Sequence, residues 1–408
     1  MSQCTHPTGL WGAQTSAMTV LLGCWRIRRW RWQGAALACA AAAVASCGVT
    51  GAHSSPAATA GAPVRQVGPA LGYRLNGVAA LSAASAWAAG LTNQGRLHVI
   101  RWDGQAWRQV PAPGGGDFNG VAAVSAADAW AVGYGTGSTQ ALIEHWNGTA
   151  WRRAATPSGL GAAILHAVAA ISPGDVWAVG GTTPTGQAVI LRWDGTAWRR
   201  VGSPAPPGTS SPELNGVTAT SAANAWAVGG THTKTQQVPL IEHWDGTAWR
   251  PVSSPAPRFG GVLTGVSASS ASNAWAVGVR TEARGTGALI EHWNGTAWTL
   301  VPSPAVSRGG LAGVTALSGT STWAVGGTVP SLQGPRTVIE RWNGTSWARV
   351  PSPARGYLAS VTAISARNAW AVGVSAFTSA ATGIIEHWNG TSWTCFTATG
   401  TAGPCSTR

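Results

Sequence analysis

The stretch Ile143-Glu144-His145-Trp146-Asn147-Gly148-Thr149-Ala150-Trp151 occurs in seven close copies along the chain of 408 residues. Each copy places two tryptophans five residues apart around an Asn-Gly or Asp-Gly dipeptide. The pairs are Trp102/Trp107, Trp146/Trp151, Trp193/Trp198, Trp244/Trp249, Trp293/Trp298, Trp342/Trp347 and Trp388/Trp393. Upstream of each pair lies a third tryptophan, and these recur every 43 to 49 residues: Trp87, Trp130, Trp177, Trp226, Trp275, Trp323 and Trp370. The chain is therefore built from seven repeats.

The Asn-Gly and Asp-Gly dipeptides predict a tight β-hairpin in each repeat, because a two-residue type I′ turn needs positive φ at both central positions. With Asn147-Gly148 as the turn, Trp146 would pair with Thr149 and Glu144 with Trp151. Side chains alternate across a strand, so this register places Trp146 and Trp151 on one face. The runs 120–125 and 129–133 predict two more short strands in the same repeat.

Four short strands in a period of 43 to 49 residues are typical of a β-propeller blade. We therefore predict an all-β, seven-bladed β-propeller with four antiparallel strands per blade over residues 71–408. The 45% hydrophobic and 10% charged residues are compatible with a packed core and exclude a polyelectrolyte-like disordered chain.

The order of a hydrophobic run, Gly-Gly, a variable loop, an aromatic residue and a tryptophan resembles the kelch repeat, as in Trp226-Ala227-Val228-Gly229-Gly230 followed by Trp244 and Trp249. The resemblance covers about residues 71–395 and implies a propeller of the galactose-oxidase and kelch type. The second glycine is kept at Gly181, Gly230 and Gly327 and is replaced by Leu91, Tyr134, Val279 and Val374 in the other repeats.

Copper-radical oxidases share that propeller, and their copper site needs two tyrosines, two histidines and a cross-linking cysteine. The only tyrosines here are Tyr73, Tyr134 and Tyr357, and the propeller has no internal cysteine. The resemblance therefore implies the fold without this activity, and we expect no cofactor.

Residues 1–46 are predicted to be a signal peptide, because a cluster of arginines precedes an apolar run that is too short to span a bilayer. The run ends in Val44-Ala45-Ser46-Cys47, which resembles the bacterial lipobox and implies lipidation of Cys47. Residues 47–70 would then be a flexible tether. Secretory cleavage near Ala52 and an uncleaved anchor are the alternatives, and translation from Met18 instead of Met1 would give a more usual signal length.

Two cysteines remain in the predicted mature domain, Cys395 and Cys405, and we expect them to form a disulfide. Residues 64–69 resemble the outer strand of a blade, so ring closure by strand exchange stays open. Arginine almost replaces lysine, and alanine and glycine are abundant, which suggests an actinobacterial source.

Positive charge exceeds negative charge by 13, and many arginines follow the second tryptophan of a pair. A basic rim for anionic partners and the protection of edge strands from aggregation both explain this pattern. Nucleic acid is disfavoured as a partner because the predicted location is outside the cytoplasm.

The repeated tryptophans resemble a carbohydrate-stacking array, and the repeated Glu-His pairs resemble a metal site. Core packing, however, explains residues that recur at equivalent positions. We therefore predict no metal site and no catalytic residue among them, and we expect the glutamates to accept hydrogen bonds from backbone or indole donors. The other acids, Asp117, Asp128, Asp175, Glu213 and Glu282, are expected in turns or connectors.

Loops on a rigid scaffold usually carry binding residues, so the ligand-binding candidates are the polar departures from the repeat: His166, His232, Lys234, Arg280 and Arg284. We expect a monomeric, exported, lipid-anchored and non-catalytic binding or scaffold module. Its partner would be a cell-envelope glycan, an anionic wall polymer or an envelope protein.

A purely structural spacer is a further possibility. The main alternative is a carbohydrate-active enzyme of glycosidase or lyase type, with its site at one mouth of the central channel. Convergence of Asp117, Asp128, Glu213 or Glu282 with a basic residue at that mouth would favour the enzyme.

Overall fold

The computed structural model describes residues 72–396, except 137–138, 205, 256, 305–307, 329–333 and 379–380. The predicted signal peptide, Cys47, the tether, residues 64–69 and Cys405 lie outside the described residues. No helix that could cross a bilayer is found in the part of the chain that is described.

The described residues form seven sheets of four antiparallel strands, each sheet made from four consecutive strands. Blade 1 contains β1 (Tyr73–Ser82), β2 (Ser85–Thr92), β3 (Leu97–Trp102) and β4 (Trp107–Gln109). Blade 2 contains β5 (Gly116–Ser125), β6 (Asp128–Gly135), β7 (Ala141–Trp146) and β8 (Trp151–Arg153). Blade 3 contains β9 (Ala163–Ser172), β10 (Asp175–Thr182), β11 (Ala188–Trp193) and β12 (Trp198–Val201).

Blade 4 contains β13 (Ser210–Ser221), β14 (Asn224–His232), β15 (Gln237–Trp244) and β16 (Trp249–Pro251). Blade 5 contains β17 (Gly261–Ser270), β18 (Asn273–Glu282), β19 (Gly285–Trp293) and β20 (Trp298–Leu300). Blade 6 contains β21 (Gly309–Ser318), β22 (Ser321–Thr328), β23 (Thr337–Trp342) and β24 (Trp347–Arg349). Blade 7 contains β25 (Tyr357–Ser365), β26 (Asn368–Val374), β27 (Gly383–Trp388) and β28 (Trp393–Cys395).

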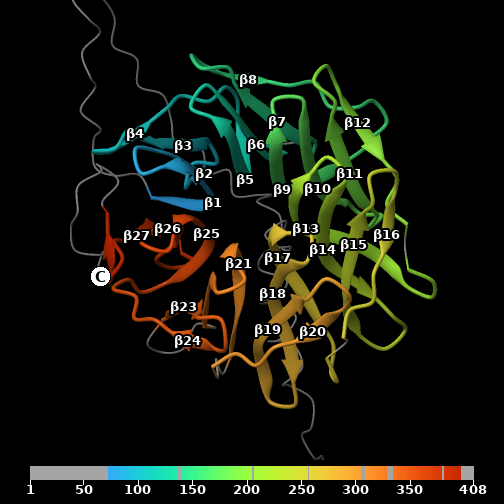
Figure 1. Ribbon diagram of the computed structural model, residues 1–408. Coiled ribbons are helices and arrows are strands. Elements are labelled where there is room, and N and C mark those ends of the chain that lie inside the picture. The colour runs from blue at the N-terminus through green and yellow to red at the C-terminus, as the bar shows by residue number, and fades with distance from the viewer. Residues whose placement is uncertain are drawn as a thin grey trace, which may run out of the picture. The chain divides into compact units, whose positions relative to one another are not determined.

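The blades surround a central axis, and the first strand of each blade lies innermost (Figure 1). The predicted seven-bladed β-propeller is confirmed. Because consecutive strands are antiparallel, one face of the ring carries the start of each innermost strand, the loop between the second and third strands, and the connector from the previous blade. We call it the entry face.

Tryptophans hold neighbouring blades together. Trp87 of blade 1 is fully buried and packs against Trp146 and Trp151 of blade 2, at ring-centroid distances of 5.1 and 5.2 Å. Trp370 of blade 7 contacts Trp102 of blade 1 at 5.0 Å, so the same packing closes the ring. The expectation that the repeated tryptophans are structural is therefore confirmed.

The predicted register of the hairpin between the third and fourth strands of each blade is wrong. Trp146 lies directly opposite Trp151, and Glu144 lies opposite Arg153, so the loop has four residues. The side chain of Asn147 explains the difference, since its Oδ1 accepts the backbone N–H groups of Thr149 and Ala150 at 3.1 and 3.0 Å. This Asx turn closes a longer loop than a type I′ turn, and both tryptophans still share one face.

Glycines allow the innermost strands to approach each other closely around the axis. A Cβ atom on Gly120 would lie 3.2 Å from the Cα atom of Ala167 in blade 3. On Gly265 it would lie 2.9 Å from the carbonyl oxygen of Ala312 in blade 6. The absence of a side chain at these positions fixes the spacing of the strands that bear the candidate site.

Candidate functional site

Two positions near the start of each innermost strand break the repeat pattern. They flank a buried apolar residue, which is Leu75 in blade 1 and Phe118 in blade 2. In blade order, the first position is occupied by Arg74, Asp117, Ile164, Glu213, Val262, Gly310 and Tyr357. The second position is occupied by Asn76, Asn119, His166, Asn215, Thr264, Ala312 and Ala359.

Charged and amide side chains thus gather on blades 1 to 4, whereas blades 6 and 7 carry Gly310, Ala312, Tyr357 and Ala359 at these positions. A repeat scaffold does not require such an asymmetry, because the same strand geometry recurs in every blade. We call the polar set the entrance arc; its members are Arg74, Asn76, Asp117, Asn119, His166, Glu213 and Asn215.

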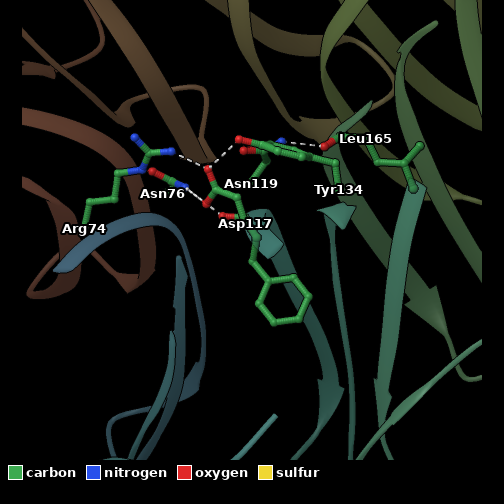
Figure 2. Close-up of polar contacts among 7 residues, drawn as sticks. Arg74, Asn76, Asp117, Asn119, Tyr134 and Leu165 are labelled. Carbon is green, nitrogen blue, oxygen red and sulfur yellow. Dashed lines mark hydrogen bonds and ion pairs between the residues drawn. The ribbon is translucent and has the colours of Figure 1, made fainter. Parts of the chain in front are cut away.

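Asp117 is the most buried member of the entrance arc, with 2% of its surface exposed. Arg74 of blade 1 forms an ion pair with its Oδ2 atom, and Asn76 Nδ2 donates to its Oδ1 atom at 2.9 Å. Tyr134 Oη lies 3.5 Å from Oδ2 on the opposite side. Figure 2 shows these three side chains converging on one carboxyl group from two blades.

The environment of Asp117 has opposing electrostatic effects. Burial raises the pKa of its carboxyl group, and the positive charge and hydrogen bond of Arg74 act in the opposite direction. The side chain of Arg74 is 46% exposed. Its guanidinium therefore binds the buried carboxyl group of Asp117 and is also accessible to solvent at the entry face. The buried partner orients the guanidinium and leaves part of it accessible to a ligand.

A histidine–glutamate pair joins blades 3 and 4. His166 Nε2 lies 2.8 Å from Glu213 Oε1, and their side chains are 17% and 16% exposed. Gly181 makes this pair possible, because a Cβ atom there would lie 3.1 Å from Glu213 Cγ. The second glycine of the repeat therefore makes room here for a charged side chain from the next blade.

The amide members of the entrance arc also connect blades. Asn76 Nδ2 donates to the carbonyl oxygen of Phe118 at 2.7 Å, and Asn119 Nδ2 donates to that of Leu165 at 2.8 Å (Figure 2). Asn215 makes the same bond to Leu263 at 2.8 Å. These bonds fix the amide planes, so the amide oxygens also have fixed orientations.

The structure places the five predicted ligand-binding residues on three blades. His166, expected in or beside a loop, lies near the start of the innermost strand β9. His232 ends β14 and Lys234 follows it in the turn to β15. Arg280 lies in β18 and pairs with Glu282 at 3.0 Å, and Arg284 lies in the turn before β19.

Two of the four acids proposed for an enzyme reach the entry face beside a basic residue on innermost strands: Asp117 with Arg74, and Glu213 with His166. Their expected position in turns or connectors is therefore wrong. Asp128 begins β6 at the opposite face, where its Oδ1 atom lies 2.9 Å from His145 Nε2. Glu282 is bound to Arg280.

The repeated histidines cover tryptophans of their own blades. His145 stacks on Trp130 with a ring-centroid distance of 4.2 Å, and in blade 3 the guanidinium of Arg192 lies 4.8 Å from the ring centroid of Trp177. His145 lies opposite Arg152 and not opposite Ala150 as the predicted register required. A histidine and an arginine thus serve the same packing function at one position.

The repeated glutamates are fully buried, and one of the expected backbone donors is present, since the N–H group of Ala354 donates to Glu386 Oε1 at 3.1 Å. Serine hydroxyl groups of the preceding connectors donate to them, as from Ser203 to Glu242 at 2.7 Å and from Ser254 to Glu291 at 2.8 Å. Among the described residues, Glu144 has no hydrogen-bond partner. Burial raises the pKa of each of the five carboxyl groups to about 7: Glu144, Glu242, Glu291, Glu340 and Glu386.

Sequence reasoning missed Arg74, Asn76, Asn119, Asn215 and the contact of Tyr134, because it sought polar departures in loops. One signal was available: Tyr134 replaces the second glycine of the repeat, and it contacts Asp117. An alignment of the seven repeats at the residue before each buried Leu or Phe would have revealed the polar half of the ring.

No family model and no curated protein sequence matches the chain. Its fold is similar to that of YCF48 from Cyanidioschyzon merolae, with 16% identity over 76% of this chain and 95% of that chain and a TM-score of 0.51. The GH74 xyloglucanase from Xanthomonas campestris has 17% identity, a TM-score of 0.53, and coverage of 77% of this chain and 54% of the enzyme.

A puromycin hydrolase S511A mutant complexed with PGG has 14% identity, with coverage of 82% of this chain and 54% of that chain and a TM-score of 0.52. At these identities the comparisons establish the β-propeller fold alone, because propellers carry unrelated functions. The kelch-type resemblance of the repeats stays a prediction.

Proposed function

We propose that the protein is an exported, membrane-anchored binding or scaffold module of the cell envelope, that it does not catalyse a reaction, and that the entrance arc is its ligand site. The observation that carries the proposal is the confinement of charged and amide side chains to the innermost strands of blades 1 to 4. Structural requirements of the repeat do not account for it, since blades 6 and 7 form the same ring with Gly310, Ala312, Tyr357 and Ala359.

The arrangement suits a ligand with hydroxyl and carboxyl groups, such as a segment of an envelope glycan. The guanidinium of Arg74 offers several donors in a fixed plane, and the amide oxygen of Asn119 offers an acceptor held by the bond of its Nδ2 atom to Leu165. Inter-blade bonds fix both groups, so little side-chain entropy is lost on binding.

Co-sedimentation with isolated cell-wall and membrane fractions tests this proposal. The variant Arg74→Gln/Asp117→Asn removes the ion pair, keeps the net charge and retains groups that can hydrogen bond to each other. We expect it to lose saturable binding. Arg367→Gln, in the turn between β25 and β26 at the opposite face, is the matched control and keeps binding. Equal binding by both variants would contradict the proposed site.

The membrane anchor rests on the lipobox-like sequence that ends at Cys47. We expect the protein to incorporate labelled fatty acid and to enter the detergent phase on phase separation. Cys47→Ser removes the acceptor thiol, so this variant stays in the aqueous phase. Labelling that persists in Cys47→Ser would contradict lipidation at this cysteine and favour an anchor elsewhere.

A glycan-cleaving enzyme is the second candidate, and the presence of Asp117 and Glu213 on innermost strands at one face favours it. Each carboxyl group is held by a basic partner from the preceding blade, an arrangement that also serves to join the blades. Chromatography of envelope glycans after incubation separates the two functions. The enzyme predicts new reducing or unsaturated ends that Asp117→Asn abolishes, whereas the binding module predicts an unchanged glycan.

A further inference from the structure

A groove with a volume of about 440 Å³ lies on blade 6, between the start of β23 and the segment that leads from β24 to β25. Arg336, Arg349 and Arg355 line it, and none of its lining residues is acidic. Three basic residues therefore share one concave surface. Their positive charges favour the entry of an anion.

Hydrogen bonds fix the floor of the groove. The hydroxyl group of Ser352 donates to Glu386 Oε1 at 2.7 Å, and that of Thr337 lies 2.8 Å from both Ser352 Oγ and the carbonyl oxygen of Ala354. These bonds occupy the hydroxyl groups and connect the floor to blade 7. The side chains of Arg349 and Arg355 are left as donors toward a ligand.

Arginines that directly follow the second tryptophan of a hairpin have a carboxylate partner where the loop begins with Asp. Arg108 pairs with Asp103 at 2.6 Å, and Arg250 pairs with Asp245 at 2.7 Å. Arg349 lies one residue further along its strand, and the loop of blade 6 begins with the uncharged Asn343. Within the described residues, neither Arg349 nor Arg355 forms an ion pair, although the buried Glu340 lies opposite Arg349 in the register.

Blade 1 offers an internal comparison. An isolated antiparallel bridge joins Arg336 to Arg355, and the equivalent bridge joins Arg96 to Gly115 between blades 1 and 2. Gln109 occupies the position that corresponds to Arg349. The same backbone bridge therefore forms in blade 1, where only one of the three equivalent positions is an arginine. The fold does not require all three arginines.

We propose that the groove lined by Arg336, Arg349 and Arg355 binds a phosphate group of an anionic ligand. Guanidinium groups bind oxyanions through paired N–H donors, and three of them offer more donors than one carboxylate can accept. A phosphate group with three or four oxygens matches this surplus. The site lies on an outer part of blade 6 and is separate from the entrance arc on the innermost strands of blades 1 to 4.

Calorimetric titration of the full-length protein with tripolyphosphate tests the site. The variant Arg349→Gln/Arg355→Gln is expected to weaken binding at least about tenfold, because it removes two charge-assisted contacts. Arg152→Gln/Arg200→Gln removes the same charge from the outer strands of blades 2 and 3 and is the control. We expect this control variant to change affinity less than about twofold, because salt screens the long-range attraction between distant surface charges and the ligand.

Poly(glycerol phosphate) and inorganic phosphate identify the source of the phosphate. Competition by the polymer supports an internal phosphodiester, and competition by inorganic phosphate alone supports a free phosphate. Wild-type affinity in the groove variant, an equal loss in the control variant, or tighter binding of citrate than of tripolyphosphate would each overturn the proposal. The Arg74→Gln/Asp117→Asn variant keeps this groove. A negative result for binding at one of the two sites therefore does not affect the test of the other.

Discussion

Replacement of Glu242 by glutamine is expected to stabilise the protein at alkaline pH and to leave its stability nearly unchanged in acid. The carboxyl group is fully buried, and the hydroxyl group of Ser203 donates to one of its oxygens at 2.7 Å. The other oxygen has no hydrogen-bond partner in the part of the chain that the structure describes. Burial raises the pKa of Glu242 from 4.5 to about 7, because a charged carboxylate is poorly solvated there. Glutamine has nearly the same shape and cannot ionise.

The sign and size of the effect follow from proton linkage. The folded protein binds this proton more tightly than the unfolded chain, so the contribution of Glu242 to stability is fully present below pH 4.5. It is lost as pH rises through about 7. The shift corresponds to about 3 kcal/mol per carboxyl group. The free energy of unfolding of Glu242→Gln should therefore exceed that of the wild type by about 2 to 3 kcal/mol at pH 8.

Urea unfolding of both proteins between pH 4.5 and 8.5 measures this difference, and the comparison cancels the other titrating groups. Ser203→Ala is an informative second variant, because the hydroxyl group of Ser203 lowers the pKa of Glu242. Without that hydroxyl group, the pKa of Glu242 should rise further. A wild-type to Glu242→Gln difference that stays constant over the whole pH range would refute the account of this buried carboxyl group.

Three further predictions concern packing and the charged pair. Trp275→Ala should lower the free energy of unfolding by about 3 to 5 kcal/mol, as measured by urea unfolding, since the indole is fully buried between two blades. Gly265→Ala should lower the melting temperature because its new Cβ atom would lie 2.9 Å from a carbonyl oxygen of the next blade, whereas Gly319→Ala has open space and should not. Arg74→Gln should destabilise the protein by about 1 to 3 kcal/mol through the unpaired Asp117, and the second change Asp117→Asn should restore part of the loss in a double-mutant cycle.

The architecture could be predicted because each structural requirement recurs seven times in the sequence. Trp130, Gly133 and the Trp146/Trp151 pair have equivalents in the other blades, so chance variation at one position hardly weakens the pattern. The hairpin register was predicted wrongly because an Asn-Gly dipeptide suits two loop lengths. The choice depends on whether the asparagine side chain accepts from the backbone, as Asn147 does.

The candidate site was harder to predict, because it depends on contacts between blades. Asp117 and Arg74 are 43 residues apart in sequence, and only the closed ring brings them together. His166 was noticed as a residue in or beside a loop, and Glu213 as a residue of a turn or connector. Nothing in the linear sequence pairs them across two blades. The site consists of departures from a repeat, and their meaning depends on which positions face the same opening.

Hydrogen–deuterium exchange of the full-length protein, with and without saturating solubilised envelope material, tests the central claim most directly. We expect slower exchange in peptides that contain the starts of β1, β5, β9 and β13, which carry the entrance arc. The equivalent peptides of blades 6 and 7 should exchange as in the free protein. Protection confined to the turns around Lys234 and Arg284, or equal protection in all seven blades, would contradict a ligand site at the entrance arc.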